Sequence, residues 1–117
     1  MNKTYQIIET ALAAGEVKTV SLPLRHEYEY ATGIFFHMRS GVATGTSVRV
    51  RIADDEVLPK GSDVTLFTIM PTFSRGETLW DFTKDNVKAR SNQLTIEFDN
   101  TKGEAKTIAT YVLLKND

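Results

Sequence analysis

Cysteine is absent from the 117 residues, which excludes disulfides, thiolate zinc ligands and cysteine nucleophiles together. An excess of one charge is also missing, since 14 basic and 15 acidic residues leave a net charge of −1. A dedicated nucleic-acid binder normally carries a basic excess, so we expect no direct nucleic-acid binding. No apolar stretch approaches the roughly 18 residues that span a bilayer or the roughly 7–15 residues at the centre of a secretory signal. We therefore expect no membrane partner and a chain that is made in a cytoplasm and either stays there or leaves it by cell lysis.

The motifs of catalysis and cofactor binding are missing as well. There is no Gly-x-Ser-x-Gly elbow and no Gly-x-x-x-x-Gly-Lys-Ser/Thr phosphate loop. His26 and His37 lie in separate predicted segments without the spacing of metal ligands. The acidic run 54–56 lacks the spaced ligands and central glycine of a calcium loop, and weakly held calcium there is the exception we allow. We expect no catalytic residues, no metal, no cofactor and no enzymatic activity.

Alternation of apolar and polar residues is the dominant pattern that is present. Segments 48–52 and 94–98 each place three apolar residues on one side and polar residues on the other. Such alternation predicts strands with one buried and one wet face. The turn-rich residues 99–103 then predict a hairpin that joins 92–99 to 104–114.

Further segments extend this pattern over most of the chain. Strands are predicted at 20–24, where Pro23 indicates an edge strand or a bulge, at 34–38 between turn signals, and at 64–70. Residues 4–14 fit either a helix capped by Thr4 or a strand over 4–10 followed by a turn around 14–16, and their strand-forming residues favour the strand. Residues 72–91 are the least regular. Seven or eight short strands at this spacing predict an all-β fold, a single antiparallel β-sandwich domain over 1–117.

A row of aromatic residues is a candidate binding surface. If 25–30 is extended, His26, Tyr28 and Tyr30 share one face and the two glutamates share the other. Such a row can stack on sugar rings, and Trp80 can play the same part. Tyr28, Tyr30 and Trp80 are therefore the stacking residues of an alternative function, a carbohydrate- or cell-surface-binding module. The competing interpretation is that these aromatics cap the core at the end of a sheet.

Several predicted strands are apolar on both faces. In 34–38, 64–70 and 111–114 the polar alternate is mostly missing, although one face of each sheet of a free sandwich meets water. Part of an outer face must then be covered, either by 72–91 or by another subunit, and we favour a subunit. We predict a homo-oligomer, or contacts with other proteins of an assembly, through six interface residues: Phe35, Phe67, Tyr111, Leu113, Arg49 and Arg51.

Two segments and the many short strands carry a family resemblance. The segments are the opening Ala13-Ala14-Gly15-Glu16-Val17-Lys18-Thr19-Val20 and the strand entry Ala31-Thr32-Gly33-Ile34-Phe35-Phe36. With these features the chain resembles the small jelly-roll and β-sandwich proteins that build bacteriophage particles. The resemblance implies a jelly-roll-like sandwich and a non-enzymatic role in a virion, as a capsid-associated, decoration, vertex or head-to-tail connector component. It assigns no site residues, because a fold does not determine a function.

Overall fold

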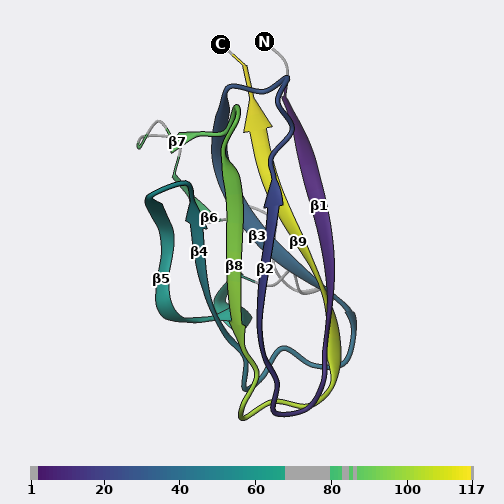
Figure 1. The fold of residues 1–117 in the computed structure, drawn as a ribbon. Coiled ribbons are helices and arrows are strands. Elements are labelled where there is room, and N and C mark those ends of the chain that lie inside the picture. Colours follow the sequence, from purple (N-terminus) through teal and green to yellow (C-terminus); the bar gives the residue numbers. More distant parts are fainter. Residues whose placement is uncertain (1–2, 68–79, 83–84, 86, 117) are drawn as a thin grey trace.

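Two antiparallel sheets packed face to face make up an all-β fold (Figure 1). The structure is a computed structural model and describes residues 3–67, 80–82, 85 and 87–116. The first sheet, here sheet A, contains β1 (Lys3–Leu12), β9 (Lys106–Lys115) and β3 (Tyr30–Ser40) in that order, with the short strands β6 (Trp80–Asp81) and β7 (Val87–Lys88) both pairing with β3. The second sheet, sheet B, has the order β2 (Val17–Pro23), β8 (Gln93–Asp99), β4 (Ser47–Ile52) and β5 (Asp55–Asp63).

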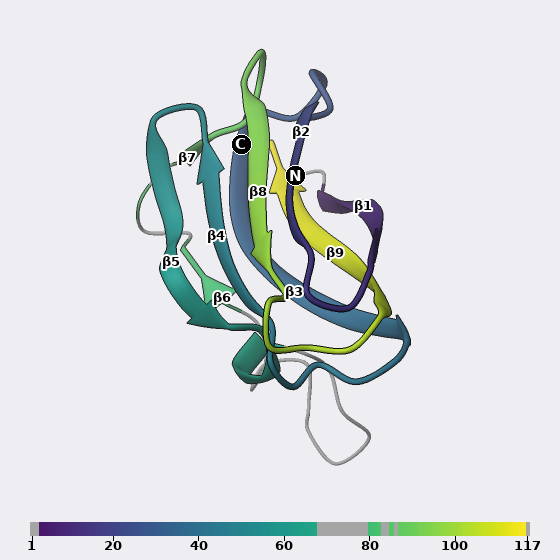
Figure 2. The ribbon, with the colours of Figure 1, turned by 60° about the horizontal axis from the view of Figure 1, so that its bottom comes forward.

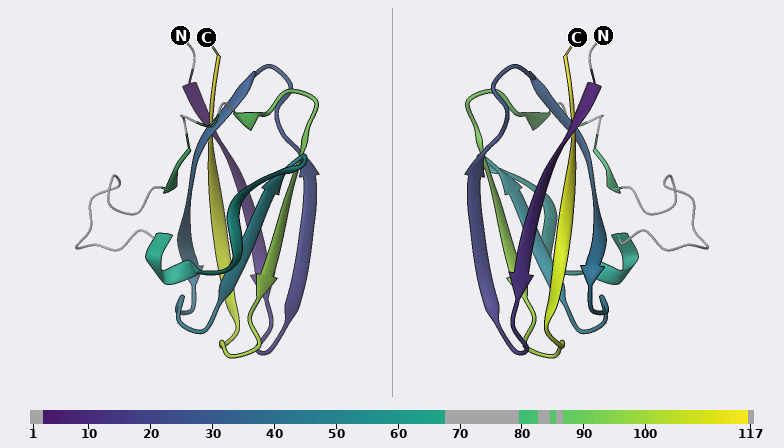
Figure 3. Two further views of the ribbon diagram at one scale, coloured as in Figure 1. Left: turned by 90° about the vertical axis from the view of Figure 1, so that its left-hand side faces the viewer. Right: turned by 90° about the vertical axis from the view of Figure 1, so that its right-hand side faces the viewer.

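The chain passes back and forth between the two sheets. Figure 2 shows the connections from β1 to β2, from β3 to β4 and from β8 to β9 together at one end of the sandwich. The two termini lie together at the opposite end, as both views of Figure 3 show. Strands that follow one another in sequence therefore mostly belong to different layers, and their hydrogen-bonding partners come from distant parts of the chain.

The core lies between the sheets and is built by the predicted alternation. In β4 and β8 the even-numbered residues are buried and the odd-numbered ones are partly or fully exposed, as expected from the sequence. The same parity holds in sheet A, where the side chains of Ile34 and Phe36 of β3 and of Ile108 and Val112 of β9 all belong to the core between the sheets. The preferred interpretation of the N-terminal segment is confirmed, since β1 is a strand and a turn at Ala14 and Gly15 leads into β2.

The predicted hairpin between 92–99 and 104–114 is wrong. β8 pairs with β2 and β4 in sheet B, whereas β9 pairs with β1 and β3 in sheet A. The turn residues bridge the layers instead, because the Asn100 side chain is buried and donates to the carbonyls of Ala13 and Glu104. A local turn signal does not distinguish a hairpin from an arch between sheets.

Three other local predictions need correction. Residues 64–67 form a 3₁₀ turn, η1 (Val64–Phe67), rather than a strand, and the rest of the predicted strand 64–70 lies outside the described residues, as does most of 72–91. Gly33 lies within β3 at a register shift and not in a turn before it. Segment 25–29 is a turn in which the Tyr28 amide donates to the Arg25 carbonyl, so the assumed alternation of its side chains does not hold. The prediction that Pro23 marks an edge strand is confirmed by the place of β2 in sheet B.

Candidate functional site

The outer face of sheet A carries a cluster of three aromatic rings. Phe35 and Tyr111 lie directly opposite each other on β3 and β9 and stack with ring centroids 4.7 Å apart and planes 8° from parallel. Tyr5 of β1 meets both rings edge-on, at 6.4 Å from Phe35 and 5.9 Å from Tyr111. Offset and edge-on arrangements of this kind are the favourable ones for aromatic pairs. The cluster is a second apolar layer on the side of sheet A away from the core.

Arg39 lies beside this aromatic cluster with its polar neighbours. Its Nε donates to Glu9 Oε1 at 2.9 Å, one terminal nitrogen donates to the Tyr111 hydroxyl at 2.9 Å, and the other lies 3.2 Å from His37 Nδ1. Burial works to lower the pKa of Arg39, but the hydrogen bonds with Glu9 and Tyr111 outweigh it and raise that pKa. The charged group therefore orients the Tyr111 ring and forms a polar border to the apolar face.

Part of the predicted interface is found on this outer face. Tyr111 and Leu113 are half-buried there, at alternate positions of β9. Phe35 is only 1 % exposed, so its own ring offers no surface to a partner. Phe67 ends η1, and its side chain lies outside the described part of the chain. The most exposed large side chains of this face belong to β1, where Tyr5 is 41 % and Ile7 is 50 % exposed, and the sequence-based set of interface residues does not include them.

The two predicted interface arginines, Arg49 and Arg51, lie on the opposite side of the molecule. Both belong to β4 in sheet B, where they form a ladder of ion pairs with acidic residues of β5 and β8. Arg49 contacts Glu56 at 2.7 Å and Glu97 at 3.6 Å, and Arg51 contacts Glu97 at 3.7 Å. These arginines therefore do not border the apolar face of sheet A, and the six predicted residues do not make one surface.

The three predicted stacking residues belong to three different parts of the chain, the turn at 25–29, β3 and β6. Arg25 lies 5.2 Å from the centroid of the Tyr28 ring, which packs against the core. Lys88 and Lys115 lie 5.3 and 5.8 Å from the centroid of Tyr30. Trp80 is exposed on β6, and its indole N–H donates to the Val57 carbonyl at 2.6 Å. A cation therefore already lies beside each of the two tyrosine rings.

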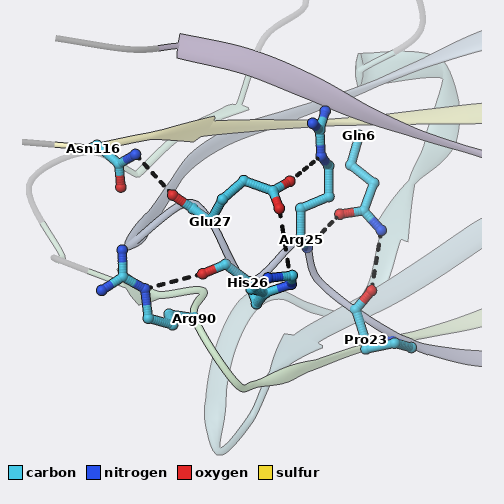
Figure 4. Close-up of polar contacts among 7 residues, drawn as sticks. All are labelled: Gln6, Pro23, Arg25, His26, Glu27, Arg90 and Asn116. Atoms are coloured by element: carbon cyan, nitrogen blue, oxygen red, sulfur yellow. Dashed lines mark hydrogen bonds and ion pairs between the residues drawn. The ribbon is translucent and has the colours of Figure 1, made fainter.

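The turn that holds Tyr28 is braced by side chains from both ends of the chain (Figure 4). Gln6 accepts from the Arg25 amide at 2.9 Å and donates to the Pro23 carbonyl at 3.1 Å. Asn116 accepts from the Glu29 amide at 2.9 Å and donates to the Glu27 carbonyl at 2.8 Å.

Charged groups on this turn, and one from the segment before β8, also bind one another or the backbone. Arg90 donates to the carbonyl of His26, whose own ring is highly exposed, at 3.0 Å. Arg25 donates to Glu27 at 2.7 Å, and this hydrogen bond is the main reason why the pKa of Glu27 lies below its usual value. These contacts hold the turn in place.

A buried polar cluster at the other end of the sandwich was missed by the sequence analysis. Asn100 and Thr46 are buried, and the Thr46 hydroxyl donates to Asn100 Oδ1 at 2.6 Å. Lys106 is 3 % exposed and donates to the Thr46 hydroxyl and, at 3.2 Å, to the Thr44 carbonyl. Burial lowers the pKa of Lys106. The available signal was its place in β9, where the alternation puts it on the same face as Ile108.

A shallow polar pocket of about 320 Å³ lies next to this buried cluster. Ser47, Asp63, Asp99 and Lys102 are among the residues that line it. Hydrogen bonds from the side chain and amide of Thr101 hold the pKa of Asp99 below its usual value. Among the described residues no group of three or more histidines, cysteines or carboxylates is placed to hold a metal ion. The acidic run 54–56 is exposed, and Glu56 is paired with Arg49.

Comparison with known proteins found no match to a family model, to a curated protein or to a solved structure. Within the described residues, no helix has the length and apolar character that a membrane span requires. The protein is an all-β protein of two packed antiparallel sheets. The outer face of sheet A carries the aromatic cluster, and that of sheet B carries the ion pairs of Arg49 and Arg51.

Proposed function

We propose that this protein is a non-enzymatic structural subunit that acts by packing the apolar outer face of sheet A against other subunits. The observation that carries the proposal is the difference between the two outer faces. Sheet A exposes Tyr5 and Ile7 beside the half-buried Tyr111 and Leu113. The corresponding face of sheet B is lined by hydroxyl groups and by the ladder of arginines and glutamates. A contiguous exposed apolar area on one side of a small protein marks an interaction site.

We also propose that the sandwich is wound as a jelly roll. If β6 and β7, which both pair with β3, count as one interrupted strand, the described residues form eight strands. These strands pair as first with last, second with seventh, third with sixth and fourth with fifth. This is the pairing of one long hairpin rolled into two sheets, and eight strands in two sheets are typical of a jelly roll. The pairing supports the jelly-roll interpretation.

A bacteriophage particle is the assembly that we propose for this subunit. Jelly rolls are common among viral capsid proteins, although the fold alone does not determine the role. The resemblance of the chain to small phage structural proteins and its apolar outer face point in the same direction. The subunit would then be located in the virion after assembly in the host cytoplasm, as a capsid-associated, decoration, vertex or connector component.

The test combines particle composition with a pair of matched variants. Mass spectrometry of gradient-purified particles from cells that encode the chain should find it in a fixed ratio to the major capsid protein. Tyr5→Glu places a charge on the apolar face and should abolish incorporation into particles. Thr19→Glu places the same charge on an exposed position of sheet B and should leave incorporation unchanged. Particles without the chain, or equal incorporation of the two variants, would overturn the proposal.

A further inference from the structure

Strand β1 is a long and regular edge of sheet A. It pairs with β9 over ten consecutive residues without a register shift, and it is the terminal strand of its sheet in the described part of the chain. The other edges are shorter or irregular. β5 pairs with β4 through two register shifts, β2 ends at a proline, and β6 and β7 have two residues each. Proteins usually protect edge strands by such irregularities, because a regular edge invites pairing with another strand.

The direction of the backbone groups of β1 follows from two independent contacts. Lys18 Nζ, which comes from the other sheet, donates to the Ala11 carbonyl at 2.7 Å, so this carbonyl points away from β9. Phe82 N donates to the Thr32 carbonyl at 2.9 Å. In this part of β3 the backbone N–H and C=O groups of even-numbered residues therefore point toward β6, and those of odd-numbered residues point toward β9. These groups alternate along each strand. The registers then show that odd-numbered residues of β9 bond to β3, and that even-numbered residues of β9 bond to even-numbered residues of β1. The N–H and C=O groups of Ile7 and Glu9 therefore point to the open edge.

The side chains around this edge leave its centre accessible. Lys18 covers the carbonyl at one end, and Gln6 ties the inner side of β1 to the Pro23 carbonyl and the Arg25 amide of the β2–β3 connection. Between these contacts the most exposed large side chain is that of Ile7, at the middle of the strand. An extended strand is the partner that satisfies outward backbone donors and acceptors while covering an apolar side chain.

We propose that β1 pairs with β1 of a second copy of this chain, antiparallel, with Ile7 on the two-fold axis. In this register Ile7 lies opposite its own copy, and Tyr5 lies opposite Glu9 of the second copy. This register places the Tyr5 hydroxyl beside the Glu9 carboxylate of the second copy, which Arg39 of that copy already binds. It places no two like charges opposite each other. A register four residues further along would oppose two Glu9 carboxylates, which is unfavourable. The inference rests on the proposed role in subunit contacts and names one of the partners.

A single cysteine provides the decisive experiment, because the natural chain has none. Directly opposite residues of a hydrogen-bonded antiparallel pair have Cα atoms about 5.5 Å apart, within the range of about 4.4–6.8 Å that a disulfide needs. Under mild oxidation Ile7→Cys should form a covalent dimer at a concentration at which Val17→Cys stays reduced. Val17 is the matched control because it is at least as exposed as Ile7 but lies at the edge of sheet B.

Proline variants test the backbone pairing itself. Light scattering of the wild type should give twice the chain mass of 13.1 kDa. Ile7→Pro removes an N–H that faces the edge and is tolerated there, so it should give a folded monomer of 13.1 kDa. Ile8→Pro removes an N–H that bonds to β9 and should unfold the chain. A wild-type monomer, a folded Ile7→Pro dimer, or Ile7→Cys oxidation no faster than that of Val17→Cys would each overturn the inference.

The two proposals fail in different ways. If the chain is present in purified particles but Ile7→Cys does not cross-link, the pairing of β1 is wrong and the structural role stands. If Ile7→Cys cross-links and the wild type is a dimer, but particles lack the chain, the pairing stands and the role in particles is wrong.

Discussion

A single buried amide, that of Asn100, joins three connections at one end of the sandwich. Its nitrogen donates to the carbonyls of Ala13 and Glu104, and its oxygen accepts from the Thr46 hydroxyl. Because these partners belong to the β1–β2, β8–β9 and β3–β4 connections, the side chain links three of the crossings between the sheets.

We expect Asn100→Ala to lower the free energy of unfolding by about 3 kcal/mol, since it leaves buried polar groups without partners. Urea titration followed by tryptophan fluorescence measures the change. Asn92→Ala is the matched control, because Asn92 donates a single exposed hydrogen bond to the Lys88 carbonyl, and it should cost about 1 kcal/mol or less. Equal costs for the two variants would show that burial of Asn100 contributes nothing.

The buried Lys106 predicts a dependence of stability on pH. Burial lowers the pKa of Lys106 in the folded state below the ordinary value of 10.5. Between the two pKa values the unfolded chain therefore binds more protons, and the free energy of unfolding rises with pH across that window.

Lys106→Met removes the ionisable group and should remove this slope. The stability of the wild type relative to the variant should therefore increase as pH rises through the window between the lowered pKa of Lys106 and the ordinary value of 10.5. Urea titrations of both proteins at a series of pH values measure the difference. A difference that stays constant over the series would contradict the prediction.

At the scale of a strand, the alternation in β3 predicts which residues share a face but not what covers each face. Its apolar residues on both faces predict a covered outer face, and the structure places Phe35 in a stacked aromatic layer rather than on an open surface. Period two assigns Ile34 and Phe36 to one side and Phe35 to the other, but it does not say what the second side meets.

We expect Phe35→Glu to unfold the domain, because a buried unpaired charge costs several kcal/mol or more. Phe35→Leu keeps an apolar side chain of similar size and should remain folded at a cost of about 1–3 kcal/mol. Circular dichroism and thermal unfolding distinguish the two variants. A folded Phe35→Glu protein that has lost an oligomer would instead place the ring at a subunit interface.

At the scale of the molecule, both sheets contribute to one core, as residues from seven of the strands pack in a single cluster. We therefore expect one cooperative unfolding transition. For 117 residues the enthalpy near 60 °C should be about 80 kcal/mol, and a calorimetric enthalpy equal to the van't Hoff enthalpy would support it. Two resolved transitions in the scan would contradict a single domain.

Only part of the apolar outer face of sheet A could be predicted from the sequence. The apolar residues Tyr111 and Leu113 were found from the sequence because their strand lacks polar alternates. Tyr5 and Ile7 were missed, although they dominate the exposed part of the face, because their segment also fits a helix, even though the strand was favoured. Arg49 and Arg51 were assigned to the wrong surface, since alternation shows that a residue faces outward but not from which sheet.

The sequence by itself determined the fold class and the inner face of most strands, because burial repeats every two residues along a pleated strand. Pro23, which lacks a backbone donor, limited its segment to an edge strand or a bulge, and the sheet order shows that it is an edge strand. Only the tertiary structure decided which strands pair, that residues 99–103 arch between the sheets, and that Lys106 and Asn100 are buried together. The physical reason is the same in each case. These features depend on contacts between residues far apart in the chain, and neither a period nor a turn signal specifies which distant strand lies beside a given one.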